Sequence, residues 1–270
     1  MSRRKPTVRT TVDELTDSAD RHHEDRLATE EPLEIRLAWP GSPARRVWVT
    51  MRTPGHDFEL ATGWAVHEGL ATAVDTVAYC TDQELSEDER FNVVTLTLGG
   101  APPRDPGHRH PASSSGSSAC GVCGKDSIAE ALAAPSAVRW SGALPEPGVV
   151  RRLPDLVREQ QPVFDRTGGV HAAALVTAAG EVVVVREDVG RHNAVDKVTG
   201  SRVLAGLSPA EACLVVSGRA GFELVQKAVA AGVGSLVAVG APTSLAVDLA
   251  RRAGLGLFGF TSSERTVKYC

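Results

Sequence analysis

The stretch that decides the fold runs from residue 211 to residue 260 and reads EACLVVSGRAGFELVQKAVAAGVGSLVAVGAPTSLAVDLARRAGLGLFGF. Its short apolar runs, which have the length and the glycine-bearing boundaries of buried strands, lie at 213–216, 236–239 and 255–260. Helical spacing of apolar residues begins at Phe222 and again at Ser244. Strands that alternate with helices in this way predict an α/β layer structure whose central part is largely parallel.

The same alternation extends upstream and brings polar junctions with it. Strands are predicted at 172–177 and 182–185, and a helix is predicted to begin at His192. The strand-to-helix junctions that are polar and contain glycine are 186–193, 217–221 and 240–244. In open α/β sheets, ligands and especially phosphates bind at the edge where strand carboxyl ends meet helix N-termini. We therefore expect the three junctions to lie side by side and to make one pocket.

The first part of the chain predicts a smaller unit of mixed secondary structure. Short or alternating apolar segments predict strands, and helical spacing predicts one helix, at 33–37, 47–49, 58–70 (the helix), 76–80 and 91–98. We assign this small α+β domain to residues 31–100. Residues 1–30 contain hardly any large apolar side chain, and we expect them to be a disordered tail.

A long segment between the two units contains the only Cys-x-x-Cys of the chain. Residues 101–124 are dominated by Pro, Gly, Ser and other polar residues, and they predict a flexible loop that presents Cys120 and Cys123. Loops of this length inside compact proteins are usually either functional or disordered. A helix is expected over 128–134, at the start of an α/β domain that we place at 125–270.

The cysteine pair predicts a reactive centre that handles sulfur. A thiol of a Cys-x-x-Cys has a lowered pKa near a cation or a helix N-terminus, and Lys125 and the helix expected after it could supply both. Cys120, farther out on the loop, is the better nucleophile. A thioredoxin-like redox pair and a structural zinc knuckle stay open as alternatives, although a knuckle needs two further ligands. A cytidine-deaminase type of zinc site does not fit, because its Glu and Pro are missing.

Composition limits the classes of function. The chain has 270 residues and a formal net charge of -4, with 42% hydrophobic and 23% charged residues, so it provides no global basic field for nucleic acid. No segment approaches the roughly 18 consecutive apolar residues of a membrane span, and the first residues do not resemble a signal peptide. Five cysteines do not suit a secreted disulfide framework. We expect a cytoplasmic protein that binds neither nucleic acid nor membranes.

The junctions supply candidates for ligand binding. These candidates are Asp188, Arg191, His192, Ser217 and Arg219. Arginine suits phosphate groups, and a carboxylate suits a base edge or a ribose. His171 follows two glycines, so it is either a structural residue or one whose imidazole is presented to the ligand or to the cysteine loop.

Several segments in a fixed order match those of a known family. They lie at 31–36, 51–55, 118–125, 164–173, 186–200, 217–228, 241–246 and 259–260. Together they resemble the formate dehydrogenase accessory sulfurtransferase family of the FdhD type. The resemblance implies a carrier that accepts sulfane sulfur from a cysteine desulfurase as a cysteine persulfide. The carrier then passes the sulfur to the molybdenum or tungsten bis(guanine dinucleotide) cofactor before that cofactor enters formate dehydrogenase.

The resemblance also implies a fold and residue roles. The second domain would be a mixed three-layer α/β domain similar to cytidine deaminases but without zinc, and the protein would form homodimers. Cys120 matches the persulfide-bearing residue and Cys123 its partner. The cofactor is implied as a bound substrate, and no permanently bound metal is expected. The matching cofactor-binding segment comprises Phe260, Thr261, Ser262, Ser263, Glu264 and Arg265.

Two rival functions remain at this point. In the first, the protein is a non-catalytic chaperone that binds the molybdenum cofactor for formate dehydrogenase. In the second, the cysteine pair is that of a thiol-disulfide oxidoreductase. A persulfide on Cys120 separates the proposed carrier from both rivals.

Overall fold

The computed structural model describes residues 5–106 and 138–270. Its first unit is a four-stranded sheet of order β4-β3-β6-β5, in which β3 pairs antiparallel with β4 and parallel with β6. The elements of this unit are β3 (Glu31–Trp39), β4 (Ser42–Arg52), α1 (Asp57–His67), β5 (Thr76–Tyr79), α2 (Glu87–Arg90) and β6 (Val93–Thr97). Leu33, Ile35 and Leu37 alternate along β3 and are fully buried in one core with α1.

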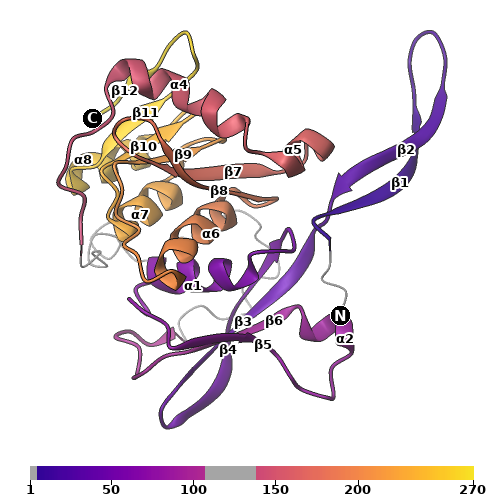
Figure 1. Cartoon of the computed structure of the whole chain (residues 1–270), viewed down its shortest axis with the longest axis vertical. Helices are drawn as coiled ribbons and strands as arrows, with labels where there is room; N and C mark the ends of the chain where they lie inside the picture. The colour runs from indigo at the N-terminus through magenta and orange to yellow at the C-terminus, as the bar shows by residue number, and fades with distance from the viewer. Residues whose placement is uncertain (1–4, 107–137) are drawn as a thin grey trace.

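An antiparallel hairpin precedes this sheet and projects from the rest of the molecule (Figure 1). It consists of β1 (Thr7–Glu14) and β2 (Arg21–Ala28). The prediction of a disordered tail over residues 1–30 is therefore wrong for these strands. The prediction relied on the absence of large apolar side chains, whereas the hairpin is held by its backbone ladder and by exposed cross-strand pairs such as Arg9 with Glu24.

The second unit is built on a six-stranded sheet of order β12-β11-β10-β9-β7-β8. Its strands are β7 (His171–Val176), β8 (Val182–Asp188), β9 (Cys213–Val216), β10 (Ser235–Ala238), β11 (Gly256–Gly259) and β12 (Val267–Lys268). β9, β10 and β11 are parallel, whereas β7 runs antiparallel to β8 and β9, and β12 runs antiparallel to β11. β7 and β12 run against the other strands because short connections join β7 to β8 and β11 to β12. A parallel neighbour would need a long crossover.

Helices cover both faces of this sheet. α6 (Arg191–Leu204), α7 (Phe222–Ala231) and α8 (Ser244–Ala253) pack on one face, where their apolar residues share a core with Leu214 and its neighbours. On the opposite face, α4 (Pro147–Arg158) packs Leu153 into a core with Val215. Leu214 and Val215 are adjacent in β9, and they enter different cores because successive strand side chains point to opposite faces. α5 (Pro162–Thr167) follows α4 and lies beside β2.

α1 connects the two units. It packs along α6, so that it lies between the four-stranded sheet and the helices of the second unit (Figure 1). Glu59 of α1 forms an ion pair with Arg186 of β8, with 2.5 Å between Oε2 and Nε. The outermost strand of the second sheet, β8, is therefore in direct contact with the first unit.

The strands and helices predicted within the described residues are confirmed to within a few residues. α2, α4, α5 and β12 have no counterpart among the predictions. In α4, Pro154 lies inside the helix and interrupts the helical pattern of the sequence. The helix expected over 128–134 and most of the loop at 101–124 lie outside the described residues. No helix in the described ranges is both long and apolar enough to cross a membrane.

Candidate functional site

The candidate site lies at one edge of the six-stranded sheet. β8, β9, β10 and β11 run in the same direction, so their carboxyl ends meet at this edge. β7 runs the other way and begins there, with His171 paired to Asp188 at the end of β8. The edge gathers the junctions at 186–193, 217–221 and 240–244, and it adds residues 260–265.

Backbone hydrogen bonds tie the junctions at 217–221 and 240–244 to each other and to Phe260. Gly240 N donates to Gly218 O at 2.9 Å, and Phe260 N donates to Gly240 O at 3.2 Å. A Cβ at Gly240 would lie 3.0 Å from Arg219 Cα, so the absence of a side chain permits the close approach of the two turns. The prediction that the junctions lie side by side is confirmed.

Arg191 and His171 meet beside the turn after β9. A Cβ on Gly218 would lie 3.6 Å from both Arg191 Cδ and His171 Cε1. Ser217 Oγ accepts a hydrogen bond from Ala172 N at 2.9 Å and lies 3.4 Å from His171 Nδ1. Burial and the nearby Arg191 lower the pKa of His171, so its imidazole is neutral at pH 7.

The Arg191 guanidinium has a donor that no described residue uses. Its Nε is buried and has no hydrogen-bond partner among residues 5–106 and 138–270. Arg219 is exposed at the same edge. A buried cationic donor without a partner costs free energy that a bound anion would recover, and guanidinium groups match phosphate oxygens in geometry. The edge therefore suits an anionic ligand.

His192 is turned toward α7. Its Nε2 lies 3.1 Å from Glu223 Oε2. Burial, reinforced by the charges of Lys227 and Arg191, lowers the pKa of His192 to about 4. At neutral pH the contact is therefore a hydrogen bond from a neutral imidazole to the carboxylate, not an ion pair. A contact between His192 and a ligand stays a prediction.

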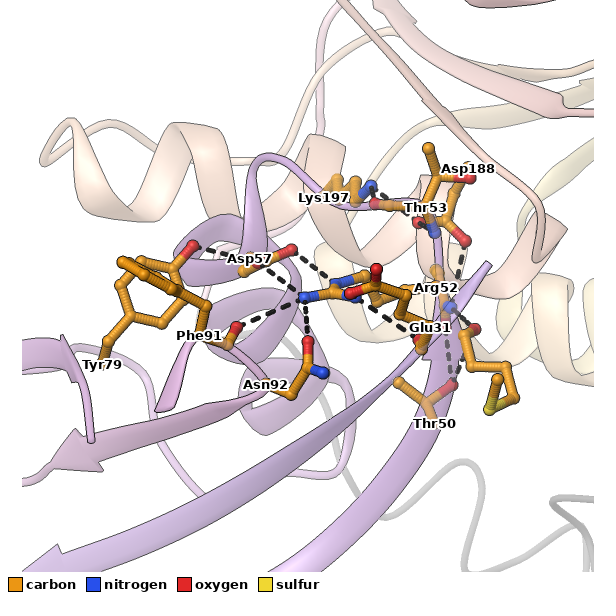
Figure 2. Close-up of polar contacts among 12 residues, drawn as sticks. Glu31, Thr50, Arg52, Thr53, Asp57, Tyr79, Phe91, Asn92, Asp188 and Lys197 are labelled. Atoms are coloured by element: carbon orange, nitrogen blue, oxygen red, sulfur yellow. Dashed lines mark hydrogen bonds and ion pairs between the residues drawn. The ribbon is translucent and has the colours of Figure 1, made fainter. Parts of the chain in front are cut away.

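Asp188 is fully buried and is saturated by donors from the chain (Figure 2). Its Oδ1 accepts from Gly190 N at 2.8 Å and from Asn193 Nδ2 at 3.1 Å. Its Oδ2 accepts from Thr53 N at 3.2 Å and lies 2.6 Å from Lys197 Nζ. Although burial raises the pKa of Asp188, four donors satisfy its carboxylate form. Asp188 thus shapes the turn before α6 and has no oxygen left for the ligand contact predicted above.

The segment after β11 displays an aromatic ring at the edge. Phe260 has a left-handed φ of 51° and is 42% exposed, and the Arg265 guanidinium lies 5.2 Å from its ring centroid. Thr261 is buried and its Oγ1 lies 2.9 Å from Thr266 Oγ1, so its side chain supports the loop. The exposed residues of the segment are Ser262, Ser263, Glu264 and Arg265.

Two cavities of the described structure lie away from this edge. A cavity of about 480 Å³ is lined by Trp140 and by residues at the C-terminal ends of α7 and α8. Another of about 330 Å³ lies in the first unit, between His56 and Tyr79. The single pocket that we predicted is therefore a set of side chains converging on the edge and corresponds to neither cavity. No group of three His, Cys, Asp or Glu residues suited to a metal ion occurs in the part of the chain that the structure describes.

Comparison with known proteins shows the family. A family model described as the FdhD/NarQ family matches residues 28–270. The chain belongs to the FdhD/NarQ family. A curated protein called sulfur carrier protein FdhD from Corynebacterium efficiens is 46% identical over 252 residues, which cover 91% of this chain and 89% of that protein. A protein of the same name from Streptomyces avermitilis is 45% identical over 265 residues, which cover 94% of this chain and 90% of the relative.

A solved structure has the same fold. A crystal structure from Desulfotalea psychrophila, provisionally described as a formate dehydrogenase accessory protein, superposes with a TM-score of 0.72. The two sequences are 21% identical, and the match covers 97% of this chain and 96% of that chain. At this identity the likeness establishes the fold.

The cysteines of this FdhD/NarQ chain differ in their environments. Cys120 and Cys123 lie outside the described residues. Cys213 is fully buried in β9, and burial raises its pKa to about 12. Burial also raises the pKa of Cys270, while Cys80 is half-buried. Cys213 is thus a packing residue without thiolate character.

Sequence reasoning missed the residues that hold the edge in place. Thr53 and Asn193 bond to Asp188, and Lys197 is buried at its side. Thr53 belongs to the segment 51–55, which we used only for the family resemblance. A signal was present, because a lysine at the centre of an otherwise buried helix implies a fixed carboxylate partner.

Proposed function

We propose that this protein is a sulfur carrier for formate dehydrogenase. It receives persulfide sulfur from a cysteine desulfurase on Cys120 and transfers it to the molybdenum or tungsten bis(guanine dinucleotide) cofactor, which is its bound substrate. Membership of the FdhD/NarQ family and the two relatives called sulfur carrier proteins support the carrier role. The observation that supports the cofactor most directly is the convergence of Arg191, Arg219 and Phe260 on one sheet edge.

The edge matches the chemistry of a guanine dinucleotide. The cofactor carries several phosphates, which suit the exposed Arg219 and the Arg191 Nε, a donor without a partner among the described residues. It also carries two guanines, and Phe260 offers an exposed aromatic face on which a base can stack. The neutral His171 and the Ser217 hydroxyl can serve as hydrogen-bond partners between these two regions.

The two cysteines of the Cys-x-x-Cys account for both the acceptance and the release of the sulfur. The Cys120 thiolate attacks the terminal sulfur of the desulfurase persulfide, and the desulfurase cysteine leaves as a thiolate. The carried sulfur is zero-valent, so its release to the metal as sulfide needs two electrons. Attack of the Cys123 thiolate on Cys120 breaks the bond to the carried sulfur, releases it as sulfide and forms a disulfide. A cellular dithiol then reduces that disulfide.

Finer features of the proposal come from the family resemblance and, for the location, from the sequence composition. These are the homodimer, the cytoplasmic location and the likeness of the second unit to cytidine deaminases. The helices on both faces of the six-stranded sheet support the three-layer part of that likeness. Gel filtration with light scattering gives the oligomeric state directly, and a monomer at micromolar concentration would contradict the dimer.

Mass spectrometry tests the transfer. The chain is incubated with a cysteine desulfurase and cysteine, and the peptide that contains Cys120 is expected to gain about 32 Da, the mass of one sulfur. Cys120→Ala should abolish the gain, whereas Cys213→Ala should leave it unchanged because that thiol is buried. The Cys120→Ala, Cys123→Ala double variant is expected not to activate formate dehydrogenase. Full activation by this variant would favour a non-catalytic chaperone, and rapid insulin reduction without persulfide would favour an oxidoreductase.

A further inference from the structure

Arg52, the last residue of β4, is anchored within the first unit (Figure 2). Its side chain is 1% exposed. Its Nε and Nη2 donate to the Asp57 carboxylate at 2.9 and 3.2 Å, and Nη2 also donates to Asn92 Oδ1 at 3.0 Å. Backbone oxygens of Glu31 and Phe91 accept further hydrogen bonds from the guanidinium. The end of β4 is therefore fixed in position.

Thr53 follows Arg52 and bonds in the opposite direction, to the second unit (Figure 2). Its backbone N–H donates to Asp188 Oδ2 at 3.2 Å, and its hydroxyl oxygen accepts from Val189 N at 3.0 Å. Its backbone oxygen accepts from Lys197 Nζ at 2.9 Å. Every polar atom of Thr53 is thus bonded to the β8–α6 junction or to α6, and the residue is 2% exposed.

The junction that Thr53 contacts determines where α6 begins. Gly190 is the residue before α6, and it provides no side-chain cap for the first turn of that helix. The turn is instead held by the Asp188 side chain, which bonds to Gly190 N, and by the Thr53 hydroxyl on Val189 N. Arg191 is the first residue of α6, so the direction of its guanidinium depends on this turn.

We propose that Thr53 is a positioning residue for the ligand edge, the sheet edge that carries Arg191, Arg219 and Phe260. The Thr53 hydroxyl holds the turn at 188–190 so that Arg191 faces the anionic ligand. The first unit then acts in binding without touching the ligand, because Arg52 fixes Thr53 and Thr53 fixes the turn. This inference rests on the proposed function, and it goes beyond it by assigning a role in ligand binding to a residue of the other unit.

Two substitutions at position 53 separate the hydroxyl from the shape of the side chain. Thr53→Val keeps the shape and leaves Val189 N without its acceptor, whereas Thr53→Ser keeps the acceptor. Affinity for GDP is measured by isothermal titration calorimetry at a temperature well below unfolding. Amide hydrogen exchange is followed in the peptides that cover 186–193. Thr53→Val is expected to weaken GDP binding about tenfold and to lose protection in these peptides, and Thr53→Ser should retain both.

Thr199→Val is the matched control. Thr199 is 2% exposed, lies in α6 and bonds through Oγ1 to His67 Nε2 at 3.0 Å across the same contact between the units. The change is chemically identical to Thr53→Val and removes one buried hydrogen bond of the same contact. It lies away from the turn, so it should lower the melting temperature and leave the affinity for GDP within about twofold of wild type.

The outcomes distinguish this inference from the function on which it rests. If the wild-type chain binds GDP and Thr53→Val binds it equally well, the positioning role is wrong and the guanine-nucleotide site stands. Equal losses of affinity in Thr53→Val and Thr199→Val also overturn the positioning role, because a general loss of stability then explains both. If the wild-type chain binds no GDP, the guanine-nucleotide site fails and the inference fails with it.

Discussion

Gly63 of α1 and Gly200 of α6 face each other across the contact between the two units. A Cβ placed on Gly63 would overlap the backbone oxygen of Asp196, and one placed on Gly200 would overlap that of Glu59. Each glycine therefore makes room for the backbone of the opposite helix. This contact brings α1 close enough for Arg186 and Glu59 to pair and for β4 to reach the β8–α6 junction.

Gly63→Ala and Gly200→Ala should each force the helices apart and destabilise the protein by roughly 1–3 kcal/mol. The free energy of unfolding from urea titration measures this effect. Gly148→Ala is the control, because Gly148 lies in α4 and a Cβ added there would meet no atom of the described residues within 4 Å. That substitution should be neutral or stabilising, since alanine favours a helix over glycine. Equal stability of all three variants would show that the helix contact tolerates a methyl group.

Arg52→Lys should be destabilising although it keeps the positive charge. Lysine cannot reproduce the two hydrogen bonds to Asp57 together with the one to Asn92. A loss of roughly 2–4 kcal/mol is expected, because the buried Asp57 carboxylate loses the two-point pairing with Arg52 and keeps the hydrogen bond from the Tyr79 hydroxyl. Arg45→Lys is the control, since Arg45 pairs with Asp105 on the surface and should cost less than about 1 kcal/mol. Chemical denaturation under the same conditions measures the free energy of unfolding of the two variants, and equal losses would contradict the special role of the Arg52 hydrogen bonds.

Much of the second unit could be predicted because its strands are short, continuous and apolar. Cys213–Val216 and Gly256–Gly259 are buried at every position, and the glycine-bearing turns after them mark where helices begin. The hairpin of β1 and β2 could not be predicted in this way, since its pairing depends on backbone hydrogen bonds between polar strands. The contact of α1 with α6 was also invisible, because Gly63 and Gly200 lie 137 positions apart in the chain.

Stability should fall as the pH is lowered from 7 to 5. Burial keeps the pKa of His192 at about 4, below its usual value near 6.5, and burial also lowers the pKa of His67. The unfolded chain then binds more protons than the folded one below about pH 6.5. Each histidine contributes stability that is complete above that pH and is lost toward its folded pKa, at up to about 1.4 kcal/mol per pH unit.

His192→Gln should flatten this dependence. Glutamine retains a donor for Glu223 and does not titrate, so one of the contributions disappears. Urea denaturation at pH 5, 6 and 7 measures the slope for the variant and for wild type. A variant slope equal to that of wild type would show that His192 titrates alike in the folded and unfolded states.

Phe260→Ala should weaken GDP binding with little effect on stability. The ring is 42% exposed, and stacking of a base on an aromatic side chain contributes about 1–3 kcal/mol, which is at least about fivefold in affinity. Phe260→Tyr keeps the stacking face and should bind like wild type. Leu207→Ala removes another exposed apolar side chain, one that lies outside the ligand edge, and should change neither quantity. Calorimetric titration with GDP gives the affinities, and unchanged binding by Phe260→Ala would remove the stacking role.

The sequence predicted the location of the candidate site better than the roles of its individual residues. Polar residues that follow buried strands must meet at one edge, so Arg191, Ser217 and Arg219 could be brought together from the pattern alone. The pattern does not reveal which polar groups are already bonded. Asp188 and Arg191 lie in the same polar junction and were both predicted to bind the ligand. The oxygens of Asp188 are already bonded to Thr53 and Lys197, which come from different units.

The buried Cys213 gives an internal standard for thiol reactivity. Its pKa of about 12 leaves on the order of one thiolate in 10⁴ at pH 8, and its side chain is fully buried. Iodoacetamide should therefore leave the Cys213 peptide unmodified in the native protein, and the desulfurase reaction should add no sulfur to it. Labelling in denaturant should reach all five cysteines, which shows that the reagent is competent. Peptide mass spectrometry reads both results, and native labelling of Cys213 at the denatured rate would mean that β9 opens readily, because neither its burial nor its raised pKa permits reaction in the folded strand.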